Sequence, residues 1–178
     1  MDRRPLIDQI PALRRYARAL TGDAWAADDL VQDTLERACA KWRLWLAGSD
    51  LRAWLFTLMH NLYVSQIRRV VRQGDLARPL DLGELDQEPA APAAPVESTI
   101  DLQRCLLRLP EEQRVVLLLV TLEDLSYAEV ARITGVPVGT VMSRLSRARS
   151  RLQELMDAPA SRHPAATESP APPLRRLK

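Results

Sequence analysis

The stretch PVGTVMSRLSRARSRL, residues 137 to 152, contains four arginines and no acidic residue. Guanidinium groups at this density suit contacts with phosphates, and an arginine can also bind the edge of a guanine through two hydrogen bonds. The whole chain has 25 Lys and Arg against 23 Asp and Glu, so this concentration of charge is local. It indicates a surface for an anionic partner rather than a generally basic protein.

The residues around this stretch predict a helix-turn-helix. Ser126 and Glu129 have the spacing of a capping box at the start of a helix that begins at Tyr127. Gly135 suits the left-handed conformation that ends a helix, and Pro137 prevents its simple continuation. The next helix has an inward apolar stripe of Val138, Val141, Leu145, Ala148 and Leu152. Its outward residues are Thr140, Ser143, Arg144, Ser146, Arg147 and Arg151.

A helix-turn-helix places its second helix in the major groove of DNA, where arginine, serine and threonine contact bases or phosphates. The capping box, the turn and the basic face occur together here and favour this interpretation. A polar helix at the surface of an ordinary helical bundle remains the alternative.

Two further segments in the first half of the chain have polar faces. DDLVQDTLERA, residues 28–38, turns Leu30, Thr34 and Leu35 to one side and leaves a mainly acidic face. LRAWLFTLMHNLYVSQIRR, residues 51–69, combines aromatic and basic side chains, which suits single-stranded DNA. The alternative for 51–69 is a core of aromatics with solvated arginines. We expect Trp54 in the core and His60 at its boundary.

The sequence gives little support to an enzyme. It contains no Gly-rich phosphate loop, no metal-ligand spacing and only two histidines, so we expect no catalytic residue, no metal and no cofactor. Cys39 and Cys105 lie in apolar helical patterns and are expected to be buried and inert. There is no signal-peptide pattern and no apolar run of about 20 residues, which predicts a cytoplasmic protein without membrane insertion.

The composition and the apolar periodicity predict an all-α fold of two small helical domains. An acidic, Pro- and Ala-rich segment between them is expected to be a flexible linker. The expected parts are a first domain over 1–73, a linker over 74–97, a helix-turn-helix domain over 98–157 and a disordered tail over 158–178. The expected helices are 6–20, 25–45, 51–72, 98–109, 111–122, one from 127 and one from about 138.

The three segments, in this order, resemble the bacterial RNA polymerase sigma factors of the extracytoplasmic-function (ECF) group, which have two conserved domains. DDLVQDTLERA resembles the helix that docks on the clamp helices of the polymerase β′ subunit. LRAWLFTLMHN resembles the segment that opens and reads the minus-10 element. LSYAEVARITGVPVGTVMSRLSRAR resembles the reader of the minus-35 element. The resemblance covers about residues 8 to 156.

The resemblance implies three sets of site residues. The polymerase set is Asp29, Gln32, Asp33 and Arg37. The minus-10 set is Ser49, Arg52, Asn61, Arg68 and Arg69, with Asn61 and the loop 47–50 capturing an unstacked base. The minus-35 set is Thr140, Ser143, Arg144, Ser146, Arg147 and Arg149. Met142 and Pro137 depart from the family pattern, which often has a basic residue and a serine at these positions.

The partners that the resemblance implies are core RNA polymerase, through its β′ clamp helices and β subunit, promoter DNA, and an anti-sigma factor. It implies no obligate homodimer. The main rival interpretation is a dimeric repressor or activator with an N-terminal sensing domain, which would bind a palindrome and would not bind polymerase.

Overall fold

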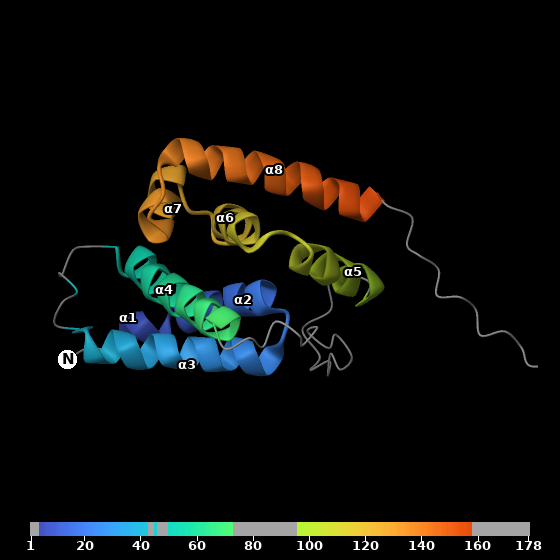
Figure 1. Ribbon diagram of the computed structural model, residues 1–178. Coiled ribbons are helices and arrows are strands. Elements are labelled where there is room, and N and C mark those ends of the chain that lie inside the picture. The colour runs from blue at the N-terminus through green and yellow to red at the C-terminus, as the bar shows by residue number, and fades with distance from the viewer. Residues whose placement is uncertain (1–3, 43–44, 46–49, 73–95, 158–178) are drawn as a thin grey trace, which may run out of the picture.

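The computed structural model describes residues 4–42, 45, 50–72 and 96–157, and within these ranges it is helical, with eight helices and no strand. The helices are stacked in layers (Figure 1). α8 lies along one side, α6 and α7 lie beneath it, α2 and α4 follow, and α3 lies on the opposite side. The expected all-α class is confirmed for the described residues.

The first domain contains α1 (Arg4–Ile7), α2 (Ile10–Thr21), α3 (Ala24–Ala40) and α4 (Leu51–Arg72). The helix expected over 6–20 is divided in two. α2 starts immediately before Pro11, which lacks a backbone N–H and is tolerated only in the first turn of a helix. α4 has the predicted bounds, and Asp50 Oδ1 caps it by accepting hydrogen bonds from the backbone N–H of Arg52 at 2.9 Å and of Ala53 at 3.2 Å.

α3 begins with a cap and ends earlier than the sequence predicts. Gly22, with φ 73°, ends α2, and the Asp23 side chain accepts a hydrogen bond of 2.6 Å from Ala26 N at the start of α3. α3 ends at Ala40, not at Trp45. The Trp42 and Trp45 rings lie 5.0 Å apart just beyond its end.

The second domain contains α5 (Val96–Leu107), α6 (Glu111–Thr121), α7 (Tyr127–Thr134) and α8 (Val138–Asp157). α5 lies two residues earlier at both ends than the expected helix 98–109. The expected linker and tail lie almost entirely in 73–95 and 158–178, outside the described residues.

The two domains contact each other, which the sequence did not predict. Helices α2 and α4 of the first domain pack against α5, α6 and α7 of the second. The buried apolar side chains of both domains form one cluster, which includes Tyr16, Phe56, Val116 and Val130. The Tyr16 and Phe56 rings meet edge to face at 5.2 Å within it.

The burial expected for three side chains was wrong. Cys39 is exposed on α3 and Cys105 is half-buried on α5, although both were expected to be buried. Cys39 lies next to the buried Ala38, and a shift of one residue on a helix turns the side chain by about 100°. Val138, expected in the inward stripe, is also exposed, at the first position of α8.

Candidate polymerase and DNA interfaces

The polymerase set lies on the exposed side of α3. Asp29, Gln32, Asp33 and Arg37 are all exposed, while Leu30, Val31 and Thr34 are buried between them. The Thr34 hydroxyl donates to Leu30 O at 2.7 Å, so this polar residue is satisfied inside the fold.

Two hydrogen bonds order this face. Gln32 Nε2 donates to Glu36 Oε1 at 3.0 Å, and Gln66 Nε2 of α4 donates to Asp33 Oδ2 at 3.5 Å. The face is therefore polar, mainly acidic and open to a partner.

The predicted helix-turn-helix is present as α7 and α8. Ser126 N donates to Glu129 Oε2 at 2.8 Å, and Glu129 N donates to Ser126 Oγ at 3.3 Å, which completes the capping box. The Ser126 hydroxyl also donates to Glu129 Oε2 at 2.5 Å, and this hydrogen bond, followed by that from Ser126 N, lowers the pKa of Glu129 because both favour its charged form. Gly135 ends α7 with φ 69°, in the left-handed conformation.

α8 turns its apolar side inward and part of the minus-35 set outward. Val141, Leu145 and Ala148 are buried, and Leu152 packs partly against the core. Thr140, Ser143 and Arg147 are spaced by three and four residues, so they share one side of the helix. Arg147 is exposed on it, and the Ser143 hydroxyl donates to Thr140 O at 3.0 Å.

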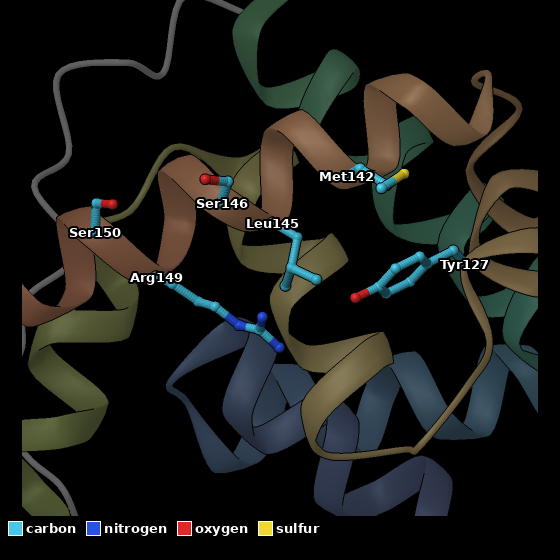
Figure 2. A pocket seen from close by; sticks show the side chains of 6 residues that line it. All are labelled: Tyr127, Met142, Leu145, Ser146, Arg149 and Ser150. Carbon is cyan, nitrogen blue, oxygen red and sulfur yellow. The ribbon is translucent and has the colours of Figure 1, made fainter.

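The remaining members of the minus-35 set lie at the edges of this side. Arg144 is largely covered, with its side chain 20% exposed, and forms an ion pair with Glu112 at the start of α6. Ser146 and Arg149 line a surface pocket with Tyr127, Met142, Leu145 and Ser150. Figure 2 shows Arg149 and Leu145 pointing toward the side of Tyr127, whereas Ser146 and Ser150 point away from it. Ser146 and Arg149 therefore both border this pocket, but their side chains point in different directions.

A second surface groove adds a residue that the sequence did not single out. Arg108, at the end of α5, lines this groove with Arg147 and Arg151 of α8. The three guanidinium groups extend the basic surface away from the turn. Arg108 carries no local sequence signal, because its proximity to α8 depends on the packing of α5 against α8.

The minus-10 set is divided between two sides of α4. Asn61, Arg68 and Arg69 are exposed, and Asn61 and Arg68 lie seven residues apart on the same side. Arg52 is nine residues before Asn61, which is two and a half turns and places it on the opposite side. Ser49 lies outside the described residues.

Arg52 faces the second domain and binds Glu123, in the loop between α6 and α7. Arg52 Nη2 donates to Glu123 Oε2 and to Glu123 O, both at 2.7 Å. Arg15 of α2 donates to Glu123 Oε1 from Nε at 3.2 Å and from Nη2 at 3.0 Å. Glu123 is fully buried, and we call these three residues the Glu123 cluster.

Two other groups on α4 are perturbed by the neighbouring domain. Burial lowers the pKa of His60, and the positive charge of Arg144 lowers it further. Burial raises the pKa of Tyr63, whose hydroxyl accepts a hydrogen bond of 3.1 Å from Arg114 Nη2. His60 and Trp54 are both half-buried, and Trp54 packs against the core.

Among the described residues, no group of three or more His, Cys, Asp or Glu side chains is placed to hold a metal ion. None of the helices over these residues is both long enough and apolar enough to span a bilayer.

Two family descriptions match the two domains. The Sigma2 domain of PhyR matches residues 6–60, and Sigma-70, region 4 matches residues 99–152. These ranges place α2 and α3 in the first match and the helix-turn-helix in the second.

Relatives of known name match both domains together. The chain is 40% identical to the ECF RNA polymerase sigma factor EcfG of Rhodopseudomonas palustris over 151 residues, covering 85% of this chain and 82% of that protein. It is 36% identical over 145 residues to the ECF RNA polymerase sigma factor SigM of Mycobacterium tuberculosis, covering 81% and 71%.

Among solved structures, the chain is similar to the sigma factor RpoE of Bartonella quintana, solved in complex with the anti-sigma factor NepR. The TM-score is 0.77 with 36% identity, over 88% of this chain and 96% of that one. The order of the two domains, the helix-turn-helix and these similarities together show that the chain belongs to the family of ECF RNA polymerase sigma factors.

Proposed function

We propose that this chain binds core RNA polymerase and directs promoter-specific initiation of transcription. The observation that carries the proposal is the helix-turn-helix, in which the half-buried Thr140 and Ser143 and the exposed Arg147 share one side of α8. In such a motif this side of the second helix enters the major groove. The membership of the sigma factor family makes the duplex partner a promoter.

The proposed work is divided between the two domains. The polymerase set of α3 binds the β′ clamp helices, with further contacts to the β subunit. The minus-35 set binds duplex DNA, and the minus-10 set holds the separated strand by cationic and base contacts. The domain limits are proposed at 1–73 and 98–157, because the first range contains α1 to α4 and the second contains α6 to α8 with all but the first two residues of α5.

These roles require binding rather than chemistry. The protein is therefore proposed to be a transcription initiation factor and not an enzyme, acting in the cytoplasm with polymerase and without an obligate homodimer. Tethering two domains in one chain raises the effective concentration of the second domain once the first has bound.

Control by an anti-sigma factor is part of the proposal. RpoE of Bartonella quintana, with 36% identity, was solved in complex with the anti-sigma factor NepR. The structural similarity covers both domains, so a protein of that kind has comparable surfaces available on this chain.

The first test measures binding to core polymerase. Asp33→Lys reverses one exposed charge at the centre of the polymerase set. We expect it to weaken binding to core polymerase by at least about tenfold, the ratio that corresponds to 1.4 kcal/mol. Asp101→Lys makes the same change of charge at an exposed position of α5 and is the matched control. We expect its binding to core polymerase to be close to that of the wild type.

The same preparation is then mixed with a promoter library, and start sites are mapped. The wild-type chain should select a defined set of promoters, and Asp33→Lys should reduce their use without changing the selected sequences. Failure of the wild-type chain to bind core polymerase would reject the proposal, and binding of a palindrome as a dimer would favour a repressor or activator.

A further inference from the structure

We propose that the Glu123 cluster is a conformational switch that holds the two domains together in the free protein and keeps Arg52 from promoter DNA. The inference rests on the proposed function, because it assigns Arg52 to the DNA-bound state. Its main observation, the buried carboxylate shared by two arginines, is independent of that function.

The geometry joins three segments that are far apart in the sequence. Arg15 comes from α2 and Arg52 from α4, both in the first domain, and Glu123 comes from the α6–α7 loop of the second. Leu122 O also accepts a hydrogen bond of 3.3 Å from Arg15 Nη2. The side chain of Glu123 is 0% exposed, whereas those of Arg15 and Arg52 are 53% and 36% exposed.

A carboxylate removed from water needs compensating charge and hydrogen bonds, and here both come from the opposite domain. Separation of the domains would expose Glu123 and both guanidinium groups to water together. The cluster therefore contributes to the closed arrangement only while all three groups are charged and in contact. Buried ion pairs often add little net stability compared with apolar packing, so this arrangement suits a reversible contact.

Arg52 has the features of a group that can exchange its partner. Its Nε is buried without a hydrogen-bond partner among the described residues, so the closed state leaves one donor of Arg52 unsatisfied. The cluster also has two positive charges against one negative charge. A DNA phosphate can replace Glu123 as the anion bound by Arg52, because it accepts the same paired N–H donors.

The two domains also share the buried apolar cluster and further polar contacts. Tyr63 accepts a hydrogen bond from Arg114, and Gln103 Nε2 donates to Ala19 O at 3.2 Å. Gly22 lies against Leu107 so closely that an added Cβ would collide with the Leu107 side chain. Loss of the Glu123 charge should therefore shift a balance between closed and open states rather than abolish the contact.

The first experiment measures the distance between the domains in the purified full-length chain. Donor and acceptor dyes are attached to the exposed Cys39 of α3 and to Ser150→Cys on α8, in a Cys105→Ala background. Glu123→Gln keeps the size of the side chain and removes its charge. We expect lower energy transfer, with the ratio of open to closed molecules raised by about tenfold.

Two further variants make this measurement decisive. Glu154→Gln removes one acid from an exposed position of α8 and should leave the transfer unchanged. Arg15→Gln removes one partner at an exposed position, so it should fold even if Glu123→Gln does not, and it should also lower the transfer. Unchanged transfer in folded Glu123→Gln and in Arg15→Gln would overturn the proposal.

The second experiment measures whether Arg52 is released. The probe is a fluorescent single-stranded DNA oligonucleotide of random sequence, titrated with the free chain at low salt. Glu123→Gln should bind it about tenfold more tightly than Asp8→Asn, which has the same net charge and changes an exposed acid outside the proposed DNA surfaces, because one more arginine can then reach phosphates. The gain should disappear in the double variant Arg52→Gln with Glu123→Gln.

An open Glu123→Gln variant whose gain in binding persists without Arg52 would overturn the assignment of Arg52. The distance measurement uses neither DNA nor polymerase, so its result is separate from that of the start-site experiment. A negative start-site result with a positive distance result would reject the sigma function and leave the closed contact established.

Discussion

The buried charge of Glu123 is compensated by residues that lie far away in the sequence. Its carboxylate is fully buried, and its counter-charges lie 108 and 71 residues earlier in the sequence, at Arg15 and Arg52. A buried charge that loses its only partner generally costs about 3 to 5 kcal/mol, but Glu123 has two counter-charges, so loss of Arg15 leaves the pair with Arg52 in place. The residue is therefore coupled to the relative position of the two domains.

His60 gives a pH-dependent prediction at the same scale. Burial and Arg144 lower its pKa below the ordinary value of 6.5, so the folded chain holds it neutral where the unfolded chain binds a proton. The stability that neutral His60 contributes is thus fully present above pH 6.5 and is lost as the pH falls below that value. The free energy of unfolding in urea should drop between about pH 7.5 and about pH 5.5, and less so in His60→Gln.

Glu111 contributes with the opposite sign, so the difference between the wild type and His60→Gln is what isolates the contribution of His60. Burial raises the pKa of Glu111 above its ordinary value of 4.5, so its contribution is lost as the pH rises through the region above 4.5. An equal drop in His60→Gln and in the wild type would contradict the role given to His60.

Individual helices depend more on local sequence than buried charges do. The capping box of α7 and the left-handed Gly135 set the turn, and the apolar stripe of α8 then fixes which side faces outward. Arg144 and Arg147 are close in sequence but differ in surroundings, because Arg144 is held by Glu112 and Arg147 is exposed. Of these two arginines of α8, Arg147 is therefore the one that is accessible to a partner.

The prediction for this element concerns salt. If Arg147 binds a phosphate, Arg147→Ala should weaken the promoter complex of the holoenzyme and make its salt dependence less steep by about 0.9 log units per log unit of salt. Binding is measured by titrating promoter DNA at several salt concentrations. Arg104→Ala on α5, which removes an exposed arginine paired with Asp101, should keep the wild-type slope. A wild-type slope in Arg147→Ala as well would remove Arg147 from the phosphate contacts.

At the scale of the molecule, the continuous apolar cluster links the stability of the two domains. All four tryptophans, Trp25, Trp42, Trp45 and Trp54, lie in the first domain, whereas helical circular dichroism reports on both domains. We expect the two signals to give the same urea midpoint in the wild type, because the domains unfold together.

In Glu123→Gln the two urea midpoints should separate, because each domain then stabilises the other less. Glu154→Gln should keep them together. Separate midpoints in the wild type would show that the contact between the domains adds little to their stability.

The features that the sequence determined depend on short-range periodicity and capping. The bounds of α4, the capping box at Ser126, the turn at Gly135 and the exposed acidic side of α3 follow from residues within one or two helical turns of each other. The burial expected for Cys39 was wrong because a difference of one residue moves a side chain to another side of the helix.

The partner of each charge was decided only by tertiary structure. Nothing near Arg52 in the sequence distinguishes it from Arg68, yet packing of α4 against the second domain gives Arg52 the Glu123 carboxylate and leaves Arg68 exposed. Arg108 joins Arg147 and Arg151 for the same reason. A helix sets the direction of a side chain from its own sequence, but what lies in that direction depends on how distant helices bury their apolar sides.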